Sequence, residues 1–355
     1  MRTLAPSTRA VHCLLHSVDE KTSPSCSPVS LKFDFAGEKT LRRVVQDVRL
    51  FREFCLRELE GVRPIEEDVH RDPTTLYEET EGTPEEWHIS RVVKLCRDVM
   101  RARIRDADFW RLVSIFVLQR RHLMEPIHIA CVLNYIKQMK LRDPQVFVCS
   151  QETILNSLGL FQLQELSILL LTYAAVGVHD ASFFCSLGDR LVTIAQEEAL
   201  KQDPGTALRS PSASSSQNIS LRTRGGRFVS REEQAALREE ETAFVSWVHA
   251  VGAFAKVGMP HQEVFEAAVP PLVRGLENLN MQVSGKFLCK TVVAYARFGF
   301  RHERLLDAAV NRIPAVFLPD DSLLALSEAF FFLKKEVPVL TNICKLRLET
   351  SYKPP

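Results

Sequence analysis

The chain has 355 residues, of which 46% are hydrophobic and 25% are charged, and its formal net charge is +1. This length allows a substantial buried core, enough for two or three ordinary domains. The near-neutral charge excludes a polycation that binds nucleic acid through its total charge, so any nucleic-acid surface has to be local. Because no run of 18 uninterrupted apolar residues is present, we expect no membrane span.

The N-terminal region lacks acidic residues. The first 18 residues contain Arg2 and Arg9 but no acid before Asp19, together with Ser, Thr, Ala and an apolar helical face. This composition is typical of an organellar transit peptide, and a disordered tail is the alternative for residues 1–36. A helical pattern at 37–60 follows, and then 61–86 carry nine acidic residues and three prolines, which predicts an acidic linker.

The cysteines favour a reducing compartment. All nine are widely separated and none forms a C-x-x-C pair. Several lie on the apolar stripes of expected helices, where a thiol behaves as a small hydrophobic group. We therefore expect no disulfide framework.

Residues 87–202 and 230–352 have helical periodicity almost throughout, and the clearest part is a helical hairpin at 282–317. Its first helix should end at Gly299, since glycine accepts the left-handed backbone beyond a helix terminus. The second apolar run extends from Leu306 to Phe317. Proline lies inside the second helices, at Pro270-Pro271 and at Pro314, and we expect a kink or a break there.

The hairpin pattern repeats along the chain. Phe254-Ala-Lys-Val-Gly258 matches Tyr295-Ala-Arg-Phe-Gly299 at an offset of 41 residues, and Tyr135 precedes Tyr173 by 38. Between Tyr173 and Phe254, residues 203–229 form a polar Ser-, Arg- and Gly-rich stretch, which we interpret as a disordered insertion. The sequence therefore predicts an all-α fold, an α-solenoid of about six stacked hairpins of 35–41 residues.

The repeat pattern resembles the heptatricopeptide and octotricopeptide families of helical-repeat proteins, which include the FAST kinase-like group. The resemblance is carried by Tyr173-Ala-Ala-Val-Gly177 and by the two segments that end at Gly258 and Gly299, and it covers about residues 90–350. It implies an α-solenoid of the mitochondrion or plastid that binds organellar RNA or belongs to a ribonucleoprotein such as the organelle's ribosome. No RAP-like domain is expected after the last hairpin.

No set of residues points to catalysis. The sequence has no phosphate-binding glycine loop and no H-E-x-x-H, and we expect no cofactor, no metal and no catalytic residue. His179-Asp180 and His261-Gln-Glu263 stand at helix starts, where the acids are expected to cap. The aromatic residues Tyr295, Phe298 and Trp247 have the spacing of a core.

Basic residues of the repeats are the candidates for RNA phosphate contact. Lys256 and Arg297 stand two residues before the glycines of their repeats, and Lys137 is equivalent by the 38-residue offset. The alternative is a solvated helix face. The full set of candidates is Lys137, Lys256, Lys286, Lys290, Arg297 and Arg301, together with Arg101, Arg103, Arg105, Arg120 and Arg121 from the densest basic zone, which also contains Arg111.

Two functions follow from these observations. The first is an RNA-associated component of a ribonucleoprotein in the mitochondrial matrix, most concretely the mitochondrial ribosome, with ribosomal RNA and protein subunits as partners. The second is a protein-only scaffold or assembly subunit of another mitochondrial complex.

Overall fold

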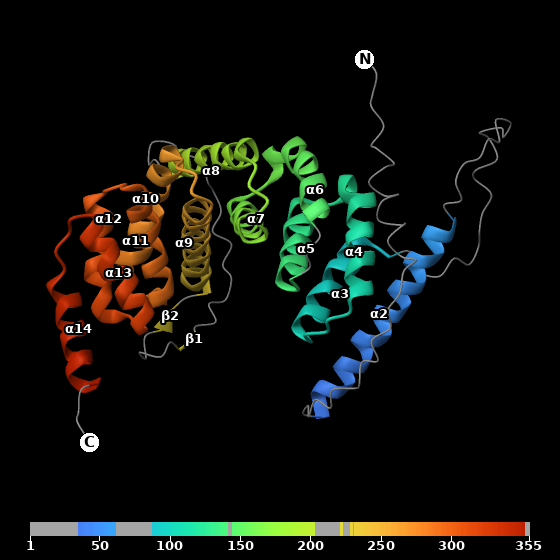
Figure 1. The fold of residues 1–355 in the computed structure, drawn as a ribbon, viewed down its shortest axis with the longest axis horizontal. Helices are drawn as coiled ribbons and strands as arrows, with labels where there is room; N and C mark the ends of the chain where they lie inside the picture. Colours follow the sequence, from blue (N-terminus) through green and yellow to red (C-terminus); the bar gives the residue numbers. More distant parts are fainter. Residues whose placement is uncertain are drawn as a thin grey trace, which may run out of the picture. The chain divides into compact units, whose positions relative to one another are not determined.

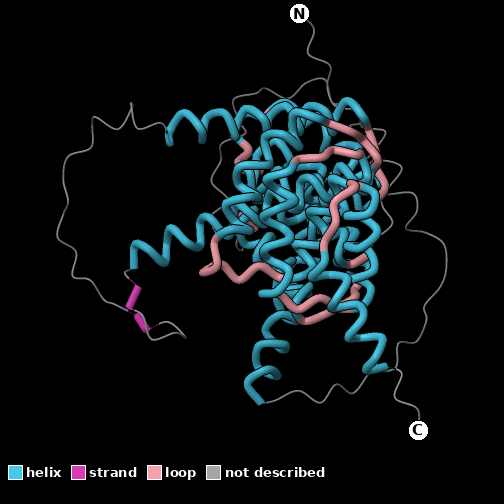
Figure 2. The backbone as a smooth tube through the Cα atoms, turned by 90° about the vertical axis from the view of Figure 1, so that its left-hand side faces the viewer, coloured by secondary structure: helices cyan, strands magenta, loops and turns pink. Residues whose placement is uncertain are grey.

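The computed structural model describes residues 35–61, 87–140, 144–202, 221–222, 228–229 and 231–351. Nearly all of the expected transit peptide or tail, nearly all of the expected acidic linker and most of the expected insertion lie outside the described residues. Almost all of the described chain is α-helical (Figure 2). Among these residues no helix is long and apolar enough to cross a membrane.

The chain divides into two compact units, residues 1–124 and 125–355. The helices of the first unit are α2 (Phe35–Gly61), α3 (Ile89–Arg101), α4 (Ala107–Arg120) and the short 3-10 helix η3 (Arg121–Leu123). Here α2 packs against both α3 and α4. Phe51 of α2 is fully buried, with edge-on ring contacts to Trp87, Phe109 and Phe116 at 5.3–5.8 Å between centroids.

The second unit contains five helical hairpins. Their helices are α5 (Pro126–Gln138), α6 (Pro144–Asn156), α7 (Leu163–Val176), α8 (Ala181–Gln202), α9 (Arg231–Val257), α10 (Gln262–Glu277), α11 (Gly285–Phe298), α12 (Glu303–Arg312), α13 (Asp320–Phe332) and α14 (Pro338–Ser351), with 3-10 helices η4 (Leu158–Leu160) and η6 (Ile313–Ala315). Together with α3 and α4, the described residues thus form six hairpins. The prediction of an all-α, solenoid-like stack is confirmed.

The hairpins of the second unit stack in two layers. In the first layer α5, α7, α9, α11 and α13 each pack against the next, and Figure 1 shows α9, α11 and α13 side by side. In the second layer α6, α8, α10 and α12 do the same. Each hairpin therefore buries its apolar stripe mainly against its neighbours, which is the arrangement of a solenoid.

A left-handed residue ends the first helix of every described hairpin. Glycine stands there three times, at Gly177, Gly258 and Gly299, with φ between 69° and 87°. In the other three hairpins the residues are Arg103, Lys140 and Lys334, with φ of 55°, 58° and 55°. The glycine stops expected from the sequence are confirmed, and these residues give a common point from which to number the repeats.

In the three hairpins with a glycine at this point, the residue four positions before it joins the hairpin to the preceding one. Tyr173 donates its hydroxyl hydrogen to the carbonyl of Phe147 at 2.8 Å, and Tyr295 donates to the carbonyl of Phe265 at 2.6 Å. Phe254 occupies the same place without a hydroxyl and meets the ring of Phe184 edge-on. Trp247 is likewise fully buried, so the packing role expected for Tyr295 and Trp247 is confirmed.

Of three local expectations, one is confirmed and two need correction. The helix is not broken at Pro270-Pro271, since α10 runs on to Glu277. At Pro314 the break is present: α12 ends at Arg312 and the proline begins η6. Because the helical period stops there, Phe317 does not join the apolar stripe and is 78% exposed.

The region between α8 and α9 contains regular structure that the sequence did not predict. Within 203–229, β1 (Leu221–Arg222) and β2 (Phe228–Val229) pair antiparallel, with Leu221 opposite Val229. Phenylalanine and valine favour extended backbone, which gives a physical reason for the pairing.

Candidate anion-binding surface

Three lysines from different helices of the first layer gather on the second unit. They are Lys137 near the end of α5, Lys256 near the end of α9 and Lys290 within α11, and we call them the lysine cluster. Burial, followed by the charge of Lys256, lowers the pKa of Lys137. Burial, followed by the charges of Lys256 and Lys137, lowers the pKa of Lys290 to about 8.

The cluster has no negative partner in the part of the chain that the structure describes. None of its three ammonium groups forms an ion pair or a hydrogen bond with another described residue. Like charges repel most strongly where water is partly excluded, and Lys137 and Lys290 are both half-buried. An anion bound between these groups would relieve that repulsion.

Lys290 lies directly against the backbone of the neighbouring helix α9. Gly252 leaves the necessary space, because a Cβ atom built there would stand 2.1 Å from Cε of Lys290. His249, one turn earlier on α9, contacts the ring of Phe287 at 5.7 Å between centroids. Burial, followed by the charges of Lys290 and Lys137, lowers the pKa of His249 to about 4, so its imidazole is neutral at pH 7.

The repeat explains part of this arrangement. Counted back from the left-handed residue, Lys256 and Arg297 share position two, as expected, and His249 and Lys290 share position nine. Positions two and nine are seven residues apart and therefore lie on one helix face.

Lys137 is not at the position that the sequence predicted. The left-handed residue of its hairpin is Lys140, so Lys137 stands three residues before it and the true repeat offset to α7 is 37. At that position α7, α9 and α11 each have a buried alanine. Lys137 is consequently half-buried, whereas Lys256 at position two is exposed.

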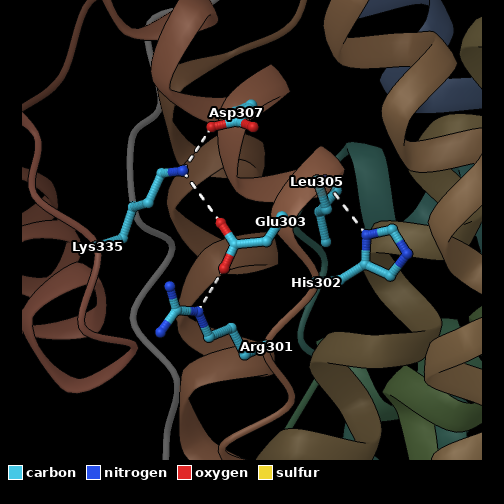
Figure 3. Close-up of polar contacts among 6 residues, drawn as sticks. All are labelled: Arg301, His302, Glu303, Leu305, Asp307 and Lys335. Carbon is cyan, nitrogen blue, oxygen red and sulfur yellow. Dashed lines mark hydrogen bonds and ion pairs between the residues drawn. The ribbon is translucent and has the colours of Figure 1, made fainter.

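The other candidates on α11 and α12 differ in their surroundings. Lys286 and Arg297 are exposed on the same face of α11 as Lys290, at spacings of four and seven residues, and have no ion-pair partner among the described residues. Arg301 is already paired: its Nε lies 2.5 Å from Glu303 (Figure 3). It is therefore a poor candidate for phosphate contact.

The pairing of Arg301 belongs to a larger ionic cluster. Lys335, from the turn after α13, lies 3.2 Å from Glu303 and 2.6 Å from Asp307 (Figure 3). The hydrogen bonds from Arg301 and Lys335 hold the pKa of the Glu303 carboxyl below its ordinary value. This cluster joins the fourth and fifth hairpins of the second unit, which is a structural role.

The arginines of the basic zone belong to the first unit. Arg120 binds Glu58 at 2.8 Å and also lies over the ring of Phe116, and Arg121 donates to the carbonyl of Leu118. Arg111 is half-buried on α4. The remaining three, Arg101, Arg103 and Arg105, are exposed at the turn between α3 and α4 without an ion pair to any described residue.

One group of side chains has the composition of a metal site. Asp189, His261 and Glu263 bring their ligand atoms within 4.8 Å of one another. Both carboxylates are exposed and already pair with the imidazole, at 3.3 Å for Asp189 and 3.9 Å for Glu263. A polar contact between α8 and the start of α10 accounts for the group. The capping expected of Asp180 is confirmed, since it accepts from the backbone of Ser182 and Phe183.

Sequence reasoning missed two residues of the candidate surface, Gly252 and His249. His249 could have been found, because the 41-residue offset that relates the two best repeats carries Lys290 onto it. The role of Gly252 could not be predicted, since nothing in the sequence indicates that the side chain of Lys290 lies against this glycine. Comparison with protein-family models and with curated proteins gives no match for this chain.

Proposed function

We propose that the protein is a non-catalytic helical-repeat component of a mitochondrial ribonucleoprotein, most concretely the mitochondrial ribosome, and that the lysine cluster contacts the phosphate backbone of its RNA. The observation that carries the proposal is the gathering of Lys137, Lys256 and Lys290 without a described carboxylate. Phosphate contacts of lysine supply the sequence-independent part of RNA affinity.

Two further features support this assignment. The exposed Lys286 and Arg297 extend the positive face along α11 on both sides of Lys290. The composition of the first 18 residues is that of a mitochondrial targeting segment. The resemblance to organellar repeat proteins points in the same direction.

Salt-dependent RNA binding tests the proposal. A labelled uridine oligonucleotide of about 20 residues should bind with an affinity that falls linearly with salt on logarithmic axes, with a slope of about −0.7 per phosphate contacted. Each of Lys137→Gln, Lys256→Gln and Lys290→Gln should make this slope shallower by about 0.7. Lys345→Gln, an exposed lysine of α14, is the matched control.

Two outcomes would contradict RNA contact at this surface. One is an unchanged salt slope in the three cluster variants. The other is a cluster that binds a polyglutamate peptide as tightly as the oligonucleotide, which would favour an acidic protein segment as the ligand.

A protein-only scaffold is the second candidate, and the last hairpin favours it. At the position where α7, α9 and α11 have a buried alanine, α13 has Phe331, which is 86% exposed. Seven residues earlier Leu324 is 63% exposed. A photo-crosslinking residue placed at 331 should label a subunit of the same mitochondrial complex in repeated experiments, and one placed at Lys286 should not.

A further inference from the structure

Lys290 has the surroundings of a reactive lysine. Its side chain crosses Gly252 of α9, where a built Cβ atom would meet Cε, Nζ and Cδ of the lysine, and the residue is half-buried. The charged and titratable groups that act on it are Lys256 and Lys137, and its own charge acts on His249 in turn. On the adjoining helices, Glu303 and Asp307 of α12 pair with Lys335, and Asp320 of α13 pairs with Arg347.

These surroundings favour the free amine. Burial and the two neighbouring lysines lower the pKa of Lys290 to about 8, so about half of it is unprotonated at pH 8. An ordinary exposed lysine is about 0.4% unprotonated at that pH. Only the free amine is a nucleophile, and desolvated lysines beside other cations are the usual nucleophilic ones.

The two remaining lysines complete the site. With Lys290 as the amine, Lys137 and Lys256 still offer two positive charges, which suit an acyl donor that carries phosphate groups. His249, neutral at pH 7, adds no competing charge. The arrangement thus combines a nucleophile with an anchor for an anionic donor.

We infer that Lys290 is an acylation site, modified without an enzyme by phosphate-bearing acyl thioesters that bind at Lys137 and Lys256. The lone pair of Nζ attacks the thioester carbonyl carbon, and the carbon–sulfur bond breaks. The sulfur leaves with the electron pair and takes up the proton that the nitrogen loses, so the products are an amide and a thiol. The amide is uncharged.

The modification would regulate the proposed RNA contact, and in this respect the inference rests on the proposed function. Acylation removes one positive charge from the cluster. Bound phosphate would have the opposite effect, because a nearby anion favours the protonated amine and so makes it unreactive. RNA-bound protein should therefore resist acylation, and acylated protein should bind RNA less tightly.

Acetylation of the full chain by acetyl-coenzyme A tests the inference without RNA. Peptide mass spectrometry should show that Lys290 reacts on the order of ten times faster than Lys286, since its larger amine fraction outweighs its lower basicity. The rate at Lys290 should level off above pH 8. It should also exceed the rate with the acetyl thioester of N-acetylcysteamine, which has no phosphate.

Two variants distinguish acetylation that depends on this site from the general reactivity of lysine. Gly252→Ala should bring the rate at Lys290 down to that of Lys286, because the new Cβ displaces the flexible end of Lys290 from its place on α9. Lys137→Gln with Lys256→Gln should slow the reaction and remove the preference for acetyl-coenzyme A. Both variants leave Lys286 as an internal reference.

Three results would overturn the inference: equal rates at Lys290 and Lys286, no plateau with pH, or equal rates with the two donors. None of these depends on RNA. Conversely, rapid acetylation of Lys290 in a protein whose RNA affinity is unaffected by Lys290→Gln would establish the acylation site and refute the proposed RNA contact.

Discussion

At the scale of single residues, the main feature is a lysine ammonium group whose surroundings disfavour its positive charge. Lys290 is half-buried beside two other lysines, and folding therefore brings its ammonium group into surroundings that disfavour it. A site that binds an anion often has this property, because the ligand supplies the missing charge. The same property makes the stability of the free protein depend on pH.

The pH dependence has a definite sign. The folded pKa of Lys290 is about 8, below the ordinary value of about 10.4, so between these values the unfolded chain binds more protons and stability rises with pH. Lys290→Met should therefore stabilise the protein at pH 7 by about 1–2 kcal/mol, after allowance for solvent screening of a half-exposed group.

Urea denaturation at pH 7 and near pH 10.5 measures this effect. The stabilisation by Lys290→Met should be much smaller at the higher pH, where the amine is neutral in the folded protein and about half neutral in the unfolded chain. Lys286→Met, on the exposed part of the same helix, should change stability by less than about 0.5 kcal/mol at either pH. An equal stabilisation at both pH values would contradict the assignment of the effect to charge.

Sequence reasoning reached the candidate surface only in part, for reasons that differ among residues. Lys256 and Arg297 follow from the glycine that ends each helix, so their shared face was predictable. Lys137 was aligned with Lys256 through the 38-residue spacing of two tyrosines, whereas the repeat offset is 37. A one-residue error in register turns a side chain by about 100° around a helix. Arg301 pairs with Glu303, which is only two residues away in the sequence, whereas the contact of Lys335 with Glu303 comes from the next hairpin and no local pattern reveals it.

At the scale of the hairpin, the recurring element is the left-handed residue that ends the first helix. The left-handed conformation of Gly177, Gly258 and Gly299 was predicted, because glycine is the residue that most often adopts it at the end of a helix. Arg103, Lys140 and Lys334 adopt it as well, and their residue types gave no signal of it, since arginine and lysine seldom have positive φ.

Exchanging these residues should change stability in opposite directions. Lys334→Gly should stabilise the protein by about 0.5–1 kcal/mol, because glycine reaches φ of 55° without strain. Gly299→Ala should destabilise it by about 1 kcal/mol for the same reason. Thermal denaturation of both variants checks the prediction, which would be wrong if both shifts had the same sign.

The contact between consecutive hairpins gives a second prediction. Tyr295→Phe removes the hydrogen bond to the carbonyl of Phe265 and should cost about 1 kcal/mol. Tyr173→Phe should have a similar effect through Phe147. The natural Phe254 at this position indicates that the ring alone is sufficient for folding. Urea denaturation measures the loss, and no loss in either variant would refute this role of the hydroxyl.

At the scale of the whole second unit, each hairpin packs mainly against its nearest neighbours. Stability in such a stack is nearly a sum of local terms, and openings can begin at an end. The general architecture was predictable because apolar periodicity and glycine stops recur along the sequence. The pairing of β1 with β2 was not, because two residues in each strand are too few to give a pattern.

Hydrogen exchange should reveal how local the stability is. Leu326→Ala on α13 should speed amide exchange mainly in α13 and α14, whereas Val248→Ala on α9 should speed it in hairpins on both sides. Both side chains are fully buried, so the comparison is matched. A uniform acceleration from α5 to α14 in both variants would mean that the stack unfolds as one unit.

Phe331 gives the last described hairpin an exposed apolar ring. At the same position α7, α9 and α11 have a buried alanine, whereas α5 has the half-buried Lys137 and is still followed by α7. The size of this residue therefore does not by itself set the number of hairpins. Duplication of the last hairpin would instead have to bury the ring of Phe331 or replace it.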